Sequence, residues 1–316
     1  MRQTRNDGGL TPRPSPPSFA SVLRLETLAR IAAQDPGALA AKVASFDLGG
    51  RHFDGNSRPS IMGVINLSAD SWYRESVCLS TESAIQRGRV LATQGADIID
   101  VGAESTLAQA QRIGESAQAS ALVPVVRGLV QAGILVSVET YHPTVTQACL
   151  AAGAQVLNLT GTVHSPEMYR LVADHDAAVI LCYVQGANVR DVGDFELRKD
   201  AVSQMYDYFG RQIDLATQAG VKRLWLDPGL GFYYRNLQDS ALRIRHQMDV
   251  FLNTFRLRKL GWPVCHALPH AFECFGEEVR SAEPFFAVLA ALGGTDLFRT
   301  HEVARTRAVL ATLSLA

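Results

Sequence analysis

Eight short apolar runs, separated by amphipathic segments, constrain the fold of this chain more than any other feature. Each run is continuous rather than alternating, which is typical of parallel strands buried on both faces. The runs predict strands at 61–66, 96–101, 134–139, 154–159, 177–184, 223–227, 262–267 and 296–300. Helical spacing between and after them predicts helices at 81–95, 116–132, 143–153, 165–175, 199–220, 239–260, 281–293 and 302–314.

This alternation predicts a single closed barrel. Eight strand–helix units in order, with no change of composition between them, favour an α/β fold of the (β/α)8 TIM-barrel type over an open, doubly wound sheet. No Gly-x-Gly-x-x-Gly follows the first run, so a dinucleotide-binding fold has no support. A chain of 316 residues is within the range of one such barrel. We expect residues 59–316 to form it.

The region before the barrel divides into two parts. Residues 1–17 are rich in Pro, Arg, Gly and Ser and lack periodicity, which predicts a disordered tail. Residues 18–46 have helical spacing that is broken at Asp35-Pro36-Gly37, and residues 47–59 carry the Gly-Gly and Asp-Gly pairs of a hairpin. We expect residues 18–58 to form a helical extension and a hairpin that plugs the N-terminal face of the barrel.

Composition excludes several classes of protein. The formal net charge of −1 gives no indication of nucleic acid or an acidic membrane as a partner. No apolar run reaches the roughly 18 residues of a spanning helix, and the N-terminus lacks the apolar core of a secretory signal. The five cysteines are scattered and odd in number, which suits a reducing compartment. We expect a cytoplasmic protein.

The ends of the predicted strands are polar, although the strands themselves are apolar. In a TIM barrel the chemistry lies at the C-terminal ends of the strands. One Asn or Asp there is most simply a turn former or a helix cap. Polar groups at all eight ends instead indicate a polar ligand, with carboxylates on one side and cationic or titratable groups on the other. The groups are Asn66, Glu104, Ser105, Thr106, Glu139, Asn158, Tyr183, Gln185, Asp227, His266, Arg299 and His301.

Six segments between residues 61 and 303 resemble, in order, the motifs of the dihydropteroate synthase and pterin-binding family. They read IMGVINLSADSWY, GADIIDVGAEST, SVETY, VLNLTG, LDPGLGF and FRTHEV. The resemblance implies a transferase of folate biosynthesis. Such an enzyme joins 6-hydroxymethyl-dihydropterin pyrophosphate to 4-aminobenzoate and releases pyrophosphate. A small-molecule pterin is then the expected partner, and a homodimer is the candidate assembly.

The resemblance also implies which residues bind the substrates. Asp227 would accept hydrogen bonds from the amino-pyrimidinone edge of the pterin, which a carboxylate can pair with in bidentate fashion. Glu139, Asn158 and Gln185 would lie near the same ring, and Phe232 beside the amine of the aminobenzoate. The structural alternatives are an ion pair that closes the barrel core and, for Phe232, core packing.

A second group is implied to hold the departing pyrophosphate. It consists of Asn66, Thr106, Arg299 and His301, which are the candidate catalytic residues. A guanidinium, an imidazole and a hydroxyl can neutralise charge on a leaving anion. Mg²⁺ is the expected cofactor, with the amide oxygen of Asn66 as its hard ligand.

The chain departs from the family where the second substrate binds. A synthase ends its seventh strand in Ser-Arg-Lys, but residues 265–272 read CHALPHAF, with no Lys or Arg. The second loop has Leu107-Ala108 in place of Arg-Pro. The carboxylate of the acceptor would therefore lose its cationic seat, which His270 is expected to replace in part.

Alternatives remain open at this level. One is a divergent pterin-barrel enzyme such as a methyl-tetrahydrofolate methyltransferase, against which the retention of Arg299 and His301 argues. Another is a pterin-binding protein without catalytic activity. A metal site at His266, His270 and Cys274 would require a helix there, which Pro269 opposes.

Overall fold

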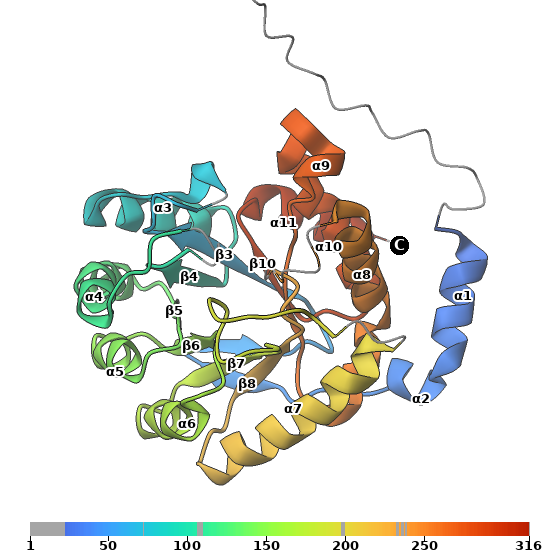
Figure 1. Ribbon diagram of the computed structural model, residues 1–316, viewed down its shortest axis with the longest axis horizontal. Helices are drawn as coiled ribbons and strands as arrows, with labels where there is room; N and C mark the ends of the chain where they lie inside the picture. The colour runs from blue at the N-terminus through green and yellow to red at the C-terminus, as the bar shows by residue number, and fades with distance from the viewer. Residues whose placement is uncertain are drawn as a thin grey trace, which may run out of the picture.

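Eight parallel strands form the centre of the molecule in the computed structural model, which confirms the predicted TIM barrel (Figure 1). The structure describes residues 23–71, 73–105, 110–196, 200–231, 234, 237 and 239–315. The strand order is β8-β7-β6-β5-β4-β3-β10-β9, and the barrel closes where the amide of Leu226 donates to the carbonyl of Pro263. The strands are β3 (Ser60–Asn66), β4 (Ile98–Gly102), β5 (Val136–Thr140), β6 (Val156–Leu159), β7 (Ala178–Cys182), β8 (Leu224–Asp227), β9 (Cys265–Ala267) and β10 (Leu297–Thr300).

Helices surround the strands on the outside of the barrel (Figure 1). Side-chain caps define several of their starts, for example Asp239, which accepts a hydrogen bond from the amide of Leu242 at 2.7 Å. The main helices are α3 (Thr81–Thr93), α4 (Glu115–Gln131), α5 (Pro143–Ala151), α6 (Ser165–Asp174), α7 (Ala201–Gln218), α8 (Ser240–Asn253), α10 (Ala282–Leu292) and α11 (Val303–Leu313). Shorter turns are η2 (Arg74–Ser76), η4 (Thr254–Leu260), α9 (Phe272–Phe275) and η5 (Gly276–Ser281).

One predicted helix is shorter than expected. The single helix predicted over 239–260 ends at Asn253 and continues as the 3₁₀ helix η4. Thr254 lies at this junction, and its hydroxyl donates to the carbonyl of Val250 four residues earlier at 2.8 Å. Such back-bonding weakens a regular helix.

The strand register places several of the polar residues at one level. Asn66 of β3 pairs in register with Gly102 of β4, Gly102 with Glu139 of β5, and Glu139 with Asn158 of β6. The four positions therefore form a row around one side of the barrel, near the C-terminal ends of the strands.

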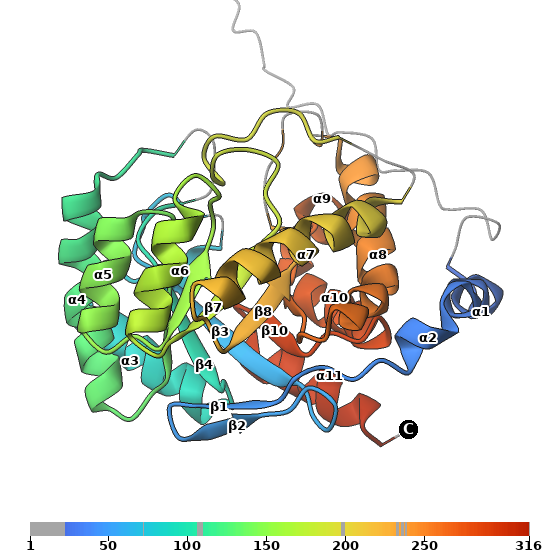
Figure 2. The same ribbon diagram turned by 90° about the horizontal axis from the view of Figure 1, so that it is seen from below.

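The hairpin of the N-terminal extension covers the opposite end of the barrel, whereas its helices lie at the side, beyond α8 (Figure 2). The extension consists of α1 (Leu25–Gln34), α2 (Pro36–Leu39) and the hairpin of β1 (Phe46–Leu48) and β2 (Arg51–Phe53). The turn uses two glycines with positive φ, a conformation that other residues rarely adopt. The rings of Phe46 and Phe53 pack edge-on against Trp225 of β8, with centroids 4.8 and 5.4 Å away. The predicted tail at residues 1–17 lies outside the described residues.

Candidate functional site

A cavity opens at the C-terminal ends of the strands, where TIM barrels hold their active sites. Five of the predicted site residues line it: Asn66, Glu139, His270, Arg299 and His301. Two others, Thr106 and Phe232, lie outside the described residues. The remaining predicted residues, Asn158, Gln185 and Asp227, do not line the cavity directly.

Three carboxylates, which we call the acidic floor, surround the guanidinium of Arg299. They are Asp100, Glu139 and Asp227. Glu139 lines the cavity, whereas Asp100 and Asp227 are buried behind it. Nη1 of Arg299 lies 3.2 Å from Oε2 of Glu139 and 3.4 Å from Oδ2 of Asp100. The separation of carboxylates from cationic groups that the strand ends suggested is therefore wrong, because the Arg299 side chain reaches across the barrel to β4 and β5.

Several hydrogen-bonding atoms of this floor are not used by the protein. Oδ1 of Asp227 accepts from the amide of Gly229 at 2.8 Å, but its Oδ2 is buried and has no hydrogen-bond partner among the described residues. The same holds for Oδ1 of Asp100, whose Oδ2 accepts from the amide of Asn158 at 2.9 Å. Nε of Arg299 is likewise buried without a partner in the described chain. Buried polar atoms of this kind are costly unless a ligand or water satisfies them.

Charge repulsion and burial shift the protonation of the floor. Burial raises the pKa of Glu139 to about 7; Arg299 opposes this rise, and Asp100 and Asp227 add to it. Burial also raises the pKa of Asp227, which Arg299 opposes. Three acids facing one guanidinium leave an excess of acceptors, so a ligand rich in hydrogen-bond donors suits this floor.

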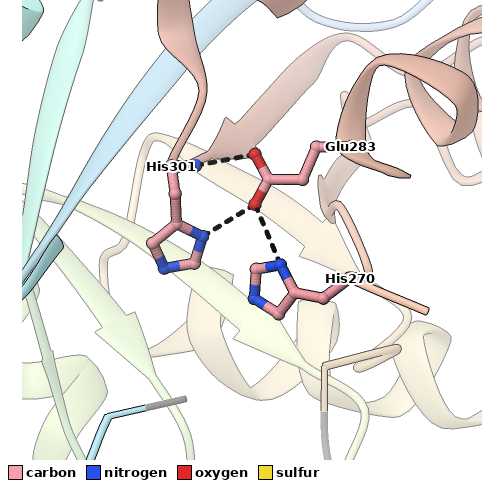
Figure 3. A group of neighbouring side chains, drawn as sticks. All are labelled: His270, Glu283 and His301. Atoms are coloured by element: carbon pink, nitrogen blue, oxygen red, sulfur yellow. Dashed lines mark hydrogen bonds and ion pairs between the residues drawn. The ribbon is translucent and has the colours of Figure 1, made fainter. Parts of the chain in front are cut away.

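A second cluster, the imidazole pair of His270 and His301, lies on another part of the cavity wall (Figure 3). Nδ1 of His301 is 2.7 Å from Oε1 of Glu283, a carboxylate of α10 that is fully buried. Nδ1 of His270 faces the same oxygen at 3.5 Å. Tyr73 stacks on both imidazoles, with centroids 4.9 Å from His270 and 4.7 Å from His301. The cluster combines residues from four separate parts of the chain.

The Asn66 side chain is oriented by its neighbours. Its Nδ2 donates to Oγ of Ser76 at 2.6 Å, and that hydroxyl in turn donates to the carbonyl of Tyr73 at 2.7 Å. Because the Ser76 proton is already used, the Asn66 amide nitrogen must be the donor to Ser76. Its Oδ1 is then the atom available to a ligand in the cavity.

The β4–α4 and β7–α7 loops are tied together by Arg190. Its guanidinium is buried and donates to the carbonyls of Ser105 at 2.7 Å and Ala110 at 2.6 Å. Gln185 belongs to the same β7–α7 loop. Its Nε2 donates to the Tyr183 hydroxyl at 2.9 Å, and its Oε1 accepts from the amide of Glu196 at 2.6 Å. Both the nitrogen and the oxygen of the Gln185 side-chain amide are therefore used in hydrogen bonds that stabilise this loop.

The histidine at the end of β9 is not part of the cavity. His266 is completely buried, and its Nε2 contacts Oγ1 of Thr254 at 2.7 Å on the outside of the barrel. Burial lowers its pKa to about 3. A metal site of His266, His270 and Cys274, against which Pro269 argued, is not formed among the described residues, because His266 lies in β9 and its Nε2 is taken by Thr254.

Sequence reasoning missed three residues that build the site. Asp100 carried a signal, since it is a charged residue inside an otherwise apolar strand. Glu283 and Arg190 carried none, because both lie in segments where charged residues are ordinary. Only the folded chain shows that both are buried, with Glu283 0% exposed and Arg190 9% exposed.

The fold and the cavity define a TIM-barrel enzyme with a small-molecule site at its C-terminal face. Residues 62–301 match the family described as pterin binding enzyme, and the chain belongs to this family. No helix within the described ranges has the length and apolar character needed to cross a membrane.

Curated relatives and solved structures agree with this assignment. A dihydropteroate synthase of Streptococcus pyogenes serotype M6 is 29% identical over 273 residues, which cover 83% of this chain and 96% of that protein. The structure of the Xanthomonas albilineans dihydropteroate synthase with 4-aminobenzoic acid has a TM-score of 0.72 at 28% identity, over 87% of this chain and 98% of that one. The same synthase in complex with 7,8-dihydropteroate has a TM-score of 0.67 at 27% identity, over 86% and 97%. The chain is therefore a dihydropteroate synthase-like transferase.

Proposed function

We propose that the cavity binds 6-hydroxymethyl-dihydropterin pyrophosphate and joins the pterin to 4-aminobenzoate or a related amine. In this reaction the amine nitrogen forms a bond to the methylene carbon of the pterin. The bond between that carbon and the pyrophosphate oxygen breaks, and the amine loses one proton. The observation that carries the proposal is the acidic floor, because its unpaired acceptors complement the donor edge of a pterin.

The acidic floor would bind the pterin ring. Oδ2 of Asp227 and Oδ1 of Asp100 are buried acceptors without protein partners in the described chain. The 2-amino group and ring N–H of a pterin are donors that a carboxylate accepts as a pair. In this role Asn158 holds Asp100 in place rather than contacting the ring, since its amide nitrogen is already bonded to that carboxylate. Glu139, which lines the cavity, completes the set.

Another part of the cavity wall would bind the pyrophosphate. His301, Asn66 and Arg299 all line the cavity, and Arg299 also contacts Glu139 of the acidic floor. A cationic guanidinium and an imidazole stabilise negative charge as it develops on a departing pyrophosphate. Thr106 is proposed for the same role from its place in the GADIIDVGAEST segment.

The donor set at Asn66 fits Mg²⁺. The orientation imposed by Ser76 leaves the amide oxygen for a ligand, and Mg²⁺ prefers oxygen ligands and retains several waters. When bound, Mg²⁺ would neutralise charge on the pyrophosphate. The contribution of the protein is to fix one oxygen ligand at the end of β3.

The acceptor subsite is the part that differs most from a synthase. The loop after β9 that borders the cavity supplies Pro269, Phe272 and Glu273 to its wall. Arg243 of α8 also lines the cavity, but it is paired with Glu273. A free carboxylate on the acceptor would have to replace Glu273 as the partner of Arg243. We therefore expect a charged acceptor such as 4-aminobenzoate to bind weakly.

The decisive experiment combines calorimetry with a turnover assay. Calorimetry with the pterin pyrophosphate should show 1:1 binding that is stronger with Mg²⁺ present. Pyrophosphate release should have a KM for 4-aminobenzoate about tenfold to a hundredfold above that of an ordinary synthase. This range corresponds to about 1.5–3 kcal/mol of binding free energy lost with the cationic group that would bind the acceptor carboxylate. Sulfonamides that mimic the acceptor should inhibit weakly. Absence of pterin binding would refute the proposed function, and an ordinary KM would refute only the altered acceptor subsite.

A further inference from the structure

The fully buried carboxylate of Glu283 does more than close a salt bridge. Its two oxygens have different partners. Oε2 accepts from the backbone amides of His301 at 2.9 Å and Glu302 at 3.0 Å and from the hydroxyl of Thr300. These bonds fix the carboxylate at the end of β10. Oε1 is left to face the imidazole pair.

The two imidazoles meet this oxygen through the same ring atom. Nδ1 of His301 is bonded to Oε1 at 2.7 Å. Nδ1 of His270 lies 3.5 Å from Oε1, and it is a buried polar atom with no hydrogen-bond partner in the described part of the chain. Figure 3 shows the second nitrogen of each ring on the side away from Glu283. Since His270 and His301 both line the cavity and Glu283 does not, that is the cavity side.

We infer that Glu283 is a positioning residue that holds His270 and His301 as a pair, with both Nε2 atoms turned into the cavity as a seat for one phosphate group. The inference rests on the proposed function and deepens it. Both imidazoles line the cavity, so His270 adds a second ring nitrogen to the wall beside His301.

The Tyr73 ring also restrains both imidazoles. Tyr73 stacks on His270 at an interplanar angle of 21° and on His301 at 27°, which prevents either ring from turning over. The Tyr73 hydroxyl is bonded to Glu302, so Tyr73 itself is fixed. Orientation of an imidazole through its Nδ1–H by a carboxylate sets the tautomer and makes the opposite nitrogen more basic. Burial lowers the pKa of His270 to about 4, so its Nε2 would donate to a phosphate oxygen only once the bound anion favours the protonated ring.

A metal ion is the other occupant that two histidines and a glutamate can hold. Ligand atoms of one tetrahedral zinc lie roughly 3.3 Å apart, as metal–nitrogen distances of 2.0–2.1 Å require. The 2.7 Å between Oε1 of Glu283 and Nδ1 of His301 is instead the length of a charge-assisted hydrogen bond. The other oxygen of Glu283 is already saturated. The geometry favours a shared proton over a metal.

Two variants test the inference. H270N keeps a donor near the position of Nδ1 but removes Nε2, whereas E283Q keeps the shape of the carboxylate but removes its charge. Calorimetry with inorganic pyrophosphate should show at least a tenfold loss of affinity in both. A pterin that carries no phosphate should bind with unchanged affinity. The control H142N removes an imidazole that lies 3.3 Å from Glu115 and does not line the cavity, and it should change neither affinity.

Nuclear magnetic resonance of the ¹⁵N-labelled histidines tests the positioning without any ligand. His301 in the wild type should carry its proton on Nδ1. E283Q should shift the resonances of both His301 and His270, while a melting curve shows a folded protein.

Unchanged imidazole resonances in E283Q would overturn the role of Glu283. Pyrophosphate affinity unaffected in H270N would overturn the two-imidazole seat. Stoichiometric Zn²⁺ binding that E283Q abolishes would replace the phosphate seat with a metal site. A wild type that binds pyrophosphate but no pterin would defeat the proposed function alone.

Discussion

At the scale of single residues, the site is built from side chains that the protein leaves unsatisfied. Asp100, Asp227 and Arg299 each keep a buried polar atom without a partner among the described residues. A protein that needed only stability would pair these atoms or replace them with apolar groups. Their persistence in one place is the physical mark of a ligand that completes them.

Asp227 provides the most direct test of that argument. D227N replaces an acceptor oxygen with a donor and should weaken pterin binding by about 2–3 kcal/mol, because hydrogen bonds to a charged group are lost. The free protein should be no less stable, since one of three mutually repelling carboxylates is removed. Calorimetry and thermal melting measure the two effects. D47N, at an exposed hairpin position, should change neither. Unaltered pterin affinity in D227N would remove Asp227 from the site.

Glu139 should make the stability of the free protein depend on pH. Its pKa in the folded chain is raised to about 7, above the ordinary value of 4.5. Between those values the folded state binds a proton that the unfolded state has released, so stability falls as pH rises through this window. E139Q removes this dependence. The melting temperature of E139Q minus that of the wild type should therefore grow from pH 5 to pH 8.

Melting curves at intervals of pH, without ligand, check this expectation. The matched control is E115Q, since the Glu115 side chain is 46% exposed and does not line the cavity. Its curve should run parallel to that of the wild type. If the E139Q curve also runs parallel, Glu139 does not carry the shifted proton.

At the scale of elements, the sequence predicted the strands and helices because each obeys a local rule. Strands buried on both faces read as continuous apolar runs, and helices show their own period. What could not be predicted was which side chains meet. Arg299 contacts Asp100 across 199 positions of the chain, and Arg190 contacts Ser105 across 85. Such pairs depend on how the barrel closes, which no local pattern encodes.

Arg190 tests how two loops depend on one such pair. R190A should lower the free energy of unfolding by about 1.5–3 kcal/mol, because two carbonyls lose a charged donor in a buried place. It should also weaken ligand binding, since Ser105 lines the cavity. R112A removes a neighbouring arginine from an exposed pair with Asp191 and should cost less than about 1 kcal/mol. Denaturant unfolding of both variants measures the difference. Equal losses would mean that burial of Arg190 has no special role.

At the scale of the whole molecule, the two ends of the barrel have separate tasks. The hairpin covers the N-terminal end (Figure 2). The residues that line the cavity lie at the C-terminal end. In this fold the loops at the mouth can differ in sequence without loss of the barrel. Stability and binding should therefore respond to different substitutions.

Phe53 of the hairpin tests this separation. Its ring is 5% exposed and packs on Trp225, so F53A should lower the free energy of unfolding by about 3–5 kcal/mol through lost burial and a residual cavity. The milder F53L keeps most of the volume and serves if F53A does not fold. Pterin affinity, measured by calorimetry at a temperature where the variant is folded, should equal that of the wild type, because the ligand binds at the other end. F285A, at a ring that is 42% exposed, should cost far less stability. A loss of pterin affinity in folded F53L would show that the hairpin communicates with the mouth, and the two ends would then have to be treated as one cooperative unit.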